Sequence, residues 1–491
     1  MNQALLPIVV ALASALASTV AHAQVIPRTG GANGVIGAIG DGGVRAVVPR
    51  LPGLADGTSN TIQIREALPN SLVTRANVSG DISQTAGQNT IGPASQFISI
   101  GGARGLTGST GNIATQGTLT GSLTQSRSGS GSGSGLGSGA QNVNIGAVVG
   151  AVTARTVDAN GAVLTSITQS SSGSFREVGA QTLDVGSVRG GGSGSITTSG
   201  LISGPGVTQT SRNETSQTLA VASVDGGAVQ NAQTSGLVSG QITQSAGVGS
   251  GASASQRIAV AQILGAQAQS VSTTGTVTGT LTQTQSVALN GGATQAVEVA
   301  SVINTDAAGF ITTNGTVTGA VTQNATMGEQ RLLVAAVVGG APTLVNAQAT
   351  LTGTVNQNSS SAFGQTVQRI AIGSVGGATG QVSTDATVGA ALTQSLGGST
   401  SGREQVISIA SAEGSQGNVA TRAVVNGSIN QSSNQSSGQQ ATSQRINIGS
   451  AQNTGTMAVR TDVTVSGNLS QSANAQSSGQ QSILIGGVAA N

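Results

Sequence analysis

The chain has 491 residues, of which 76 are Gly, 1% are aromatic and 7% are charged, and its net charge is only +2. Ordinary globular domains carry about 25% charged residues and disordered tails are charge-rich, so the composition fits neither class. There is no Cys, Trp or Tyr, and the single His, His22, lies in the export signal identified next. Thiolate and imidazole metal sites and Ser-His-Asp or Cys-His catalysis are thereby excluded from the mature chain. We expect no enzymatic activity, catalytic residue, metal site or cofactor.

The first 23 residues resemble a secretory signal peptide. An apolar run from Ala4 to Val20 is followed by Ala21-His22-Ala23, an A-x-A site that predicts cleavage before Gln24. The segment Met1-Asn2-Gln3 departs from the usual pattern because it has no Lys or Arg. A short transmembrane anchor is the alternative, but a retained span needs about 20 apolar residues with charged flanks. We expect an exported, extracellular or cell-surface protein with no membrane span after signal removal.

The mature chain divides into a leader and an array of repeats. Residues 24–71 lack the repeated pattern and are predicted to form a flexible or separately docked leader. Residues 72–491 form one repeat domain, because a repeat array is a single elongated unit whatever its length. Its basic residues are all Arg, and they are scattered without interleaved aromatics, so we expect no nucleic-acid partner.

Eleven copies of a glutamine motif recur in the array with a period of about 39 residues. In each copy a branched apolar residue and a small polar residue precede a first glutamine: Gln84, Gln125, Gln169, Gln209, Gln244, Gln283, Gln323, Gln357, Gln394, Gln431 and Gln471. A second glutamine then heads the pattern Q-x-[apolar]-x-[apolar]-[Gly/Ala]: Gln96, Gln141, Gln181, Gln217, Gln256, Gln295, Gln330, Gln368, Gln405, Gln444 and Gln481. Such a period is typical of stacked repeats, none of which can bury its apolar face alone.

Alternation of side-chain type predicts two strands in each repeat. From Val271 to Gln283 the apolar and small residues share one parity and the Ser and Thr residues share the other, which is the period of a β-strand. The shorter strand repeats the rule, as in Gln368, Ile370 and Ile372. We therefore expect an all-β, elongated β-solenoid (β-helix-like) of about eleven repeats of about 39 residues, each with one long and one shorter strand.

A glycine recurs on the inward parity, four residues before the first glutamine. Glycine weakens a strand, so its recurrence indicates a bend, a bulge or close approach of another backbone, and we favour a bend in a thin interior. Eight copies carry it: Gly80, Gly121, Gly240, Gly279, Gly319, Gly353, Gly427 and Gly467.

Both glutamines share the apolar parity and are predicted to face inward. An unpartnered buried amide costs about 1–3 kcal/mol, so the interior tolerates them only if equivalent glutamines stack and bond to one another, as in cross-β ladders. In the alternative interpretation the glutamines end their strands and point to solvent.

The residues on the outward parity of the strands suggest two hypotheses about the surface. A row such as Thr278, Thr280 and Thr282 is similar to the ice-binding surface of several antifreeze families, although Thr is also simply a good strand residue. Arg residues follow four second glutamines, and they either attract acidic cell-surface polysaccharide or act as charges that limit lateral aggregation: Arg257, Arg331, Arg369 and Arg445.

The glutamine-headed alternating strands of residues 72–491 resemble those of bacterial functional-amyloid fibre subunits, namely curli subunits and Fap-type fibrils. That resemblance implies a secreted subunit that adds head to tail to an extracellular fibre in biofilm matrix or adhesion. Independently, Ser482–Val488 reads as a complete second strand with only three residues after it, so we expect an uncapped edge that templates another chain.

We therefore predict a secreted structural protein, either a fibre subunit or a surface adhesin, whose partner is itself or another fibre subunit. The alternative is a monomeric solenoid that binds ice or glycan. A polysaccharide-degrading β-helix is disfavoured because Asp and Glu number only 16 and the aromatic platforms of sugar clefts are missing.

Overall fold

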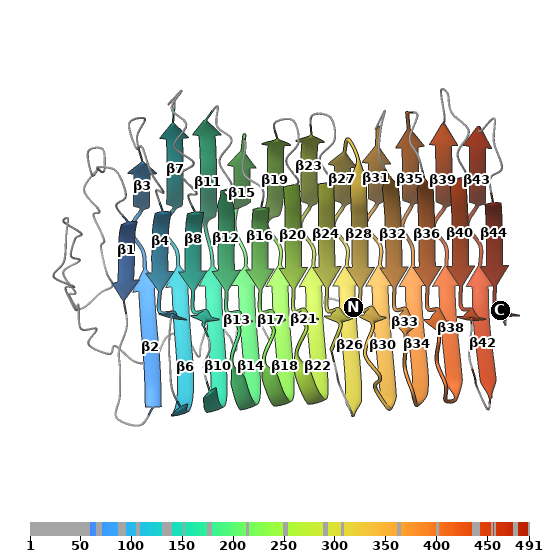
Figure 1. The fold of residues 1–491 in the computed structure, drawn as a ribbon, viewed down its shortest axis with the longest axis horizontal. Helices are drawn as coiled ribbons and strands as arrows, with labels where there is room; N and C mark the ends of the chain where they lie inside the picture. Colours follow the sequence, from blue (N-terminus) through green and yellow to red (C-terminus); the bar gives the residue numbers. More distant parts are fainter. Residues whose placement is uncertain are drawn as a thin grey trace.

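The computed structural model describes residues 59–64, 71–86, 95–104, 109–129, 140–150, 153–173, 179–212, 216–248, 254–287, 293–305, 309–360, 365–398, 402–434, 442–452, 455, 458–474 and 480–489. The predicted signal peptide and most of the predicted leader lie outside these ranges. Every element in the described residues is a β-strand, and every strand pairing is parallel. The strands stack side by side in chain order along the long axis of the molecule (Figure 1). The predicted β-solenoid is confirmed.

Four sheets run along the solenoid, and each coil contributes one strand to each. Sheet I comprises β2 (Ser71–Val78), β6 (Ser109–Leu119), β10 (Thr153–Val163), β14 (Gly192–Ile202), β18 (Ala228–Val238), β22 (Gln267–Val277), β26 (Phe310–Val317), β30 (Leu344–Leu351), β34 (Gln381–Val388), β38 (Val419–Val425) and β42 (Val459–Val465). Sheet II comprises β3 (Ile82–Ala86), β7 (Leu123–Gly129), β11 (Ser166–Gly173), β15 (Gly206–Ser211), β19 (Gln241–Val248), β23 (Leu281–Val287), β27 (Val321–Ala325), β31 (Val355–Ser359), β35 (Leu392–Gly397), β39 (Ile429–Asn434) and β43 (Leu469–Asn474).

The other two sheets complete each coil. Sheet III comprises β1 (Ser59–Ile64), β4 (Ser95–Ile100), β8 (Ala140–Ile145), β12 (Ala180–Val185), β16 (Ser216–Val221), β20 (Ala254–Val260), β24 (Ala293–Val299), β28 (Gly328–Val334), β32 (Thr366–Ile372), β36 (Arg403–Ile409), β40 (Thr442–Ile448) and β44 (Gln480–Ile485). Sheet IV comprises β5 (Ala103–Arg104), β9 (Val148–Val149), β13 (Val188–Arg189), β17 (Val224–Asp225), β21 (Ile263–Leu264), β25 (Val302–Ile303), β29 (Val337–Val338), β33 (Val375–Gly376), β37 (Ala412–Glu413), β41 (Ala451–Gln452) and β45 (Val488–Ala489).

Sheets I, II and IV contain eleven strands each, which matches the eleven copies in the sequence. Each repeat is one coil, so eleven strands at about 4.8 Å give a rod of roughly 50 Å. Sheet III has a twelfth strand, β1, which pairs with β4. This strand comes from within the stretch predicted to be a leader. The array itself begins at Ser71, one residue before the predicted start at Leu72.

The predicted long strand is in fact two strands, which meet at a corner between sheets I and II. In the sixth coil, β22 ends at Val277 and β23 begins at Leu281. The parity of inward residues continues through the corner, which is why the alternation alone suggests a single strand. At the corner the N–H groups of Thr278 and Gly279 both donate to the carbonyl of Val238 in the preceding coil. The bend expected from the recurrent glycine is therefore present.

Close stacking of backbones explains why this corner prefers glycine. A Cβ added to Gly279 would lie 2.0 Å from the carbonyl oxygen of Gly240, and one added to Gly319 would lie 1.9 Å from that of Gly279. The same contact recurs at Gly121, Gly353, Gly427 and Gly467. Bend and close backbone approach thus occur together at these positions.

The Gly279→Ala variant is expected to lower the free energy of unfolding by about 1–3 kcal/mol, because the added methyl forces the stacked backbones apart. Ala390 occupies this position in the ninth coil, which shows that a local shift can accommodate a methyl and bounds the cost. Gly376→Ala is the matched control, since its Cβ would meet nothing closer than 3.9 Å. Denaturant unfolding of both variants measures the difference, and equal midpoints would contradict the close-contact explanation.

The shorter predicted strand also ends in a corner, after which the chain forms sheet IV. Five alanines adopt the left-handed conformation there, with φ of 51° at Ala222, 53° at Ala261, 49° at Ala300, 48° at Ala335 and 46° at Ala410. A buried threonine of sheet I braces this corner: the Thr273 hydroxyl donates to the carbonyl of Ala300 at 2.9 Å. Eight other coils have the same bond, from Thr74, Thr115, Thr198, Thr234, Thr313, Thr384, Thr421 and Thr461.

Candidate functional site: the glutamine ladders and the end faces

The first glutamines form one continuous column inside sheet II. Pairing of each strand with the next places glutamine beside glutamine, as in Gln244↔Gln283 and Gln283↔Gln323. The Nε2 of each glutamine donates to the Oε1 of the glutamine in the preceding coil, and all ten bonds are 2.7–2.8 Å long. Ten of the eleven side chains are at most 1% exposed, and Gln471 of the last coil is half-buried. We call this column the first ladder.

The second glutamines form a second ladder inside sheet III with the same direction of donation. Its ten Nε2–Oε1 distances lie between 2.6 and 3.0 Å. All its members from Gln96 to Gln444 are buried, whereas Gln481 of the last coil is exposed. The alternative interpretation, in which the glutamines point to solvent, does not describe these side chains.

The two ladders face each other and are joined through the backbone. The second N–H of Gln283 donates across the interior to the carbonyl of Ala296 in the same coil, at 3.2 Å. The second N–H of Gln256 donates to the carbonyl of Thr284 in the following coil, at 3.1 Å. Amides of the second ladder therefore tie each coil to the next, in addition to the bonds along the ladder.

One inward-facing buried glutamine lies outside both ladders and stacks on no other amide. Gln285 follows Gln283 by two residues on β23, and its side chain is 2% exposed. Its neighbours in the adjacent strands are Ala246 and Ala325, so no amide stacks above or below it. Neither Nε2 nor Oε1 of Gln285 has a hydrogen-bond partner. An inward amide is thus satisfied only where its neighbours are also amides.

The two end faces of the described solenoid differ in exposure. In the first coil, Val78 is 0% exposed, Ile98 is 0% exposed and Gln84 is 1% exposed. In the last coil, by contrast, Ile483 is 44% and Ile485 is 45% exposed, although the equivalent side chains of the preceding coil, Ile446 and Ile448, are fully buried. The face formed by β42 to β45, called here the open face, therefore presents both apolar side chains and the edges of four sheets.

Ladder direction gives the open face a definite polarity. Donation runs from each coil to the preceding one, so the Oε1 atoms of Gln471 and Gln481 accept no bond from a following coil in the described residues. A strand stacked on the open face would satisfy these acceptors with amide donors.

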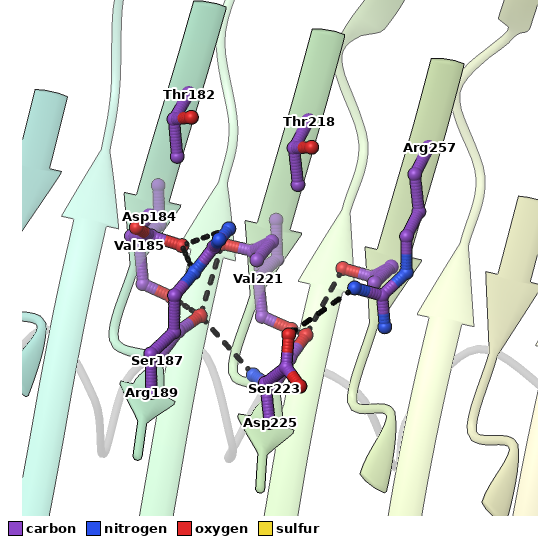
Figure 2. Close-up of polar contacts among 12 residues, drawn as sticks. Thr182, Asp184, Val185, Ser187, Arg189, Thr218, Val221, Ser223, Asp225 and Arg257 are labelled. Atoms are coloured by element: carbon purple, nitrogen blue, oxygen red, sulfur yellow. Dashed lines mark hydrogen bonds and ion pairs between the residues drawn. The ribbon is translucent and has the colours of Figure 1, made fainter. Parts of the chain in front are cut away.

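Charged residues gather in a notch between the outer face of sheet III and sheet IV. Asp184 is an outward residue of β12, yet its side chain is 2% exposed, because Arg189 of β13 folds over it with a 2.8 Å ion pair (Figure 2). Farther along the notch, fully buried Glu298 pairs with Arg257 at 2.9 Å and with Arg331, and accepts a hydrogen bond from Gln262 at 2.5 Å. Arg257 also reaches Asp225 at 3.5 Å (Figure 2).

These contacts change the interpretation of three of the four arginines predicted to form a surface stripe. Arg257 and Arg331 are only 18% and 30% exposed and are committed to Glu298, while Arg369 pairs with Glu404 at 3.2 Å. The notch therefore holds arginines and carboxylates of neighbouring coils together, which favours a structural role over attraction of acidic polysaccharide.

Burial raises the pKa of the Asp184 carboxyl, although Arg189 opposes the shift. A carboxyl whose pKa is higher in the folded protein than in the unfolded chain stabilises the fold most at low pH, and this contribution is lost as pH rises through the folded pKa. Asp184→Asn is therefore expected to be more stable than the parent at pH 7, with the difference shrinking on acidification. Denaturant midpoints measured from pH 3 to pH 8 test this, and a parent that is more stable at pH 7 would contradict it.

Threonine, serine and asparagine cover the outer face of sheet II. They occupy both positions that flank the first glutamine in all eleven coils, and all are half-buried or exposed. Before the glutamine these are Ser83, Thr124, Thr168, Thr208, Thr243, Thr282, Thr322, Asn356, Thr393, Asn430 and Ser470. After it they are Thr85, Ser126, Ser170, Thr210, Ser245, Thr284, Asn324, Asn358, Ser395, Ser432 and Ser472. We call these two columns the hydroxyl-amide face.

Within the described residues, no helix has the length and apolar character needed to cross a bilayer. Comparisons with protein-family models, with curated proteins and with solved structures found no match to this chain.

Proposed function

We propose that this protein is a secreted, non-enzymatic structural subunit that joins copies of itself head to tail into an extracellular fibre or surface adhesin. The open face carries the proposal: it exposes Ile483 and Ile485, whose equivalents in the preceding coil are fully buried. Unpaired strand edges template the addition of further strands. The resemblance to functional-amyloid subunits implies the same role in biofilm matrix or adhesion.

Ladder polarity favours head-to-tail joining over tail-to-tail joining. At the open face the free ladder atoms of Gln471 and Gln481 are Oε1 acceptors. In the first coil, Gln84 uses Nε2 toward the carbonyl of Phe97, and this nitrogen has a second hydrogen to donate. Head-to-tail stacking brings donors to acceptors and extends the ladder in its own direction. Two open faces placed together would set acceptor against acceptor in both ladders.

Incubation of the mature chain tests the proposal, with electron microscopy and light scattering as readouts. We expect filaments whose length is many multiples of the roughly 50 Å solenoid. A monomeric coil already contains strands at the spacing of about 4.8 Å, so the length of the particle, and not that reflection alone, decides the outcome. A chain that stays monomeric at high concentration, with or without seeds, contradicts the proposal.

The hydroxyl-amide face supports a second candidate function, the binding of an ordered surface such as ice or a glycan by the monomer. Its two columns are unbroken over eleven coils and lie on one parallel sheet. Thr282→Lys with Thr322→Lys would abolish ice shaping or glycan retention under this candidate. The same pair would leave end-to-end assembly unchanged under the first.

A further inference from the structure

Strand β1 has the sequence pattern of a sheet III strand although it precedes the first repeat. Its pairing with β4 sets Asn60 beside Gln96, Ile62 beside Ile98 and Ile64 beside Ile100. The last strand of sheet III has the same spacing of an amide and two isoleucines in Gln481, Ile483 and Ile485. β1 therefore occupies the position on β4 that suits a strand such as β44.

β1 is a single strand and not a complete coil. Sheet III gains a twelfth strand from it, whereas sheets I, II and IV begin with β2, β3 and β5 of the first coil. Ile98 and Ile100, beside β1, are fully buried, but Ile483 and Ile485 at the opposite end are nearly half exposed. The first-coil face is thus closed over sheet III and the open face is not.

A retained β1 is incompatible with full joining of two copies. If β44 of one copy stacked on β1 of the next, sheets I and II would be left two strand spacings apart, about 9.6 Å. Gln471 and Gln84 would then be separated by that gap, whereas the bonds along the first ladder are 2.7–2.8 Å long. If β44 instead pairs with β4, all four sheets and both ladders continue without a gap.

We propose that β1 is a displaceable cap. It pairs with the edge of β4 in the free protein, and β44 of a second copy replaces it there when the two copies join. The inference rests on the head-to-tail assembly proposed above, and it identifies one contact that must be broken before sheet III can join. Joining exchanges one strand for another of the same pattern at sheet III, and it adds new pairing at the other three sheets.

A reversible disulfide tests whether the cap must leave. Gln63 and Ser99 are paired residues of β1 and β4, and Cα atoms of neighbouring strands lie about 4.8 Å apart, within the range that a disulfide spans. The chain has no other cysteine, so Gln63→Cys with Ser99→Cys forms a single defined bond. We expect elongation of this variant to be at least tenfold slower when oxidised than when reduced. The parent, treated with the same oxidant and reductant, is the control and should not change.

Deletion of residues 59–64 is the complementary experiment, and it should shorten the lag and speed elongation. Equal elongation by the oxidised and reduced variant, together with an unaltered rate in the deletion, would overturn the cap while leaving fibre assembly intact. Assembly of the deletion variant at a concentration at which the parent is still monomeric would support the cap. If parent, reduced variant and deletion all remain monomeric, the proposed function fails and the cap fails with it.

Discussion

Replacing Gln283 with alanine is expected to lower the free energy of unfolding by about 3 kcal/mol or more, one of the largest effects of any single substitution in the array. The side chain donates to Gln244 and to the carbonyl of Ala296, and accepts from Gln323. Its removal leaves Oε1 of Gln244 without its ladder donor and one N–H of Gln323 without its ladder acceptor, although Nε2 of Gln323 keeps the carbonyl of Arg331. Each buried group that loses a partner costs about 1–3 kcal/mol, and the cavity left by the side chain adds to the loss. Urea or guanidinium unfolding followed by circular dichroism provides the measurement.

The neighbouring Gln285 supplies the matched control on the same strand. Because its buried amide has no partner, Gln285→Leu should raise the free energy of unfolding by about 1–3 kcal/mol. Leu396 already occupies the equivalent position of the ninth coil and is 2% exposed, so leucine fits this column. Equal losses at Gln283→Ala and Gln285→Ala would show that buried volume, and not stacking of amides, explains the stability.

Charge placed on the open face should stop assembly without unfolding the subunit. In Ile483→Asp with Ile485→Asp, both substitutions lie at half-exposed positions, so the monomer tolerates them. On joining, however, each carboxylate would be buried in place of an isoleucine. A loss of at least about 3 kcal/mol corresponds to more than a 100-fold rise in the critical concentration, which sedimentation after incubation measures.

Ser482→Asp with Ser470→Asp adds the same charge to the outward faces of β44 and β43, where both side chains are exposed. This control should assemble nearly as the parent does. If the two double variants behave alike, net charge rather than the open face controls assembly.

The sequence predicts the coil count and the inward residues because both follow from periodicity. Alternation from Leu72 onward identifies the apolar columns, and the spacing of the glutamines fixes one coil per repeat. Pairing amide with amide in every strand then follows from the register, since a slip of one residue would turn every glutamine outward.

The corners and the notch cannot be predicted from the alternation of residue types, for physical reasons. Parity runs unchanged through Gly279, so alternation cannot separate β22 from β23. The left-handed alanines, such as Ala300, occupy a conformation that costs about 1–2 kcal/mol and that alanine does not signal in a sequence. Gly275 partly indicates this corner in the sequence, because a Cβ at that position would lie only 2.9 Å from the backbone nitrogen of Ala300.

Asp184 and Glu298 lie on the outward parity and for that reason appear solvated in the sequence. They are buried because the two-residue strands of sheet IV fold back beside sheet III. Aligned repeats place Arg257 and Arg331 in one column, and Glu298 lies two residues farther along in the coil between them, which is a signal for this cluster.

Site-specific cross-linking tests head-to-tail joining most directly. Thr85 and Ser472 are exposed residues that follow the first glutamines of the first and last coils, ten strands apart in sheet II. In a joined pair, the two residues would lie on adjacent strands, about 4.8 Å apart. Single-cysteine variants Thr85→Cys and Ser472→Cys, mixed and oxidised under assembly conditions, should yield the mixed disulfide in preference to either homodimer. Predominant Ser472→Cys homodimers, or no cross-link at all in assembled material, would contradict head-to-tail stacking.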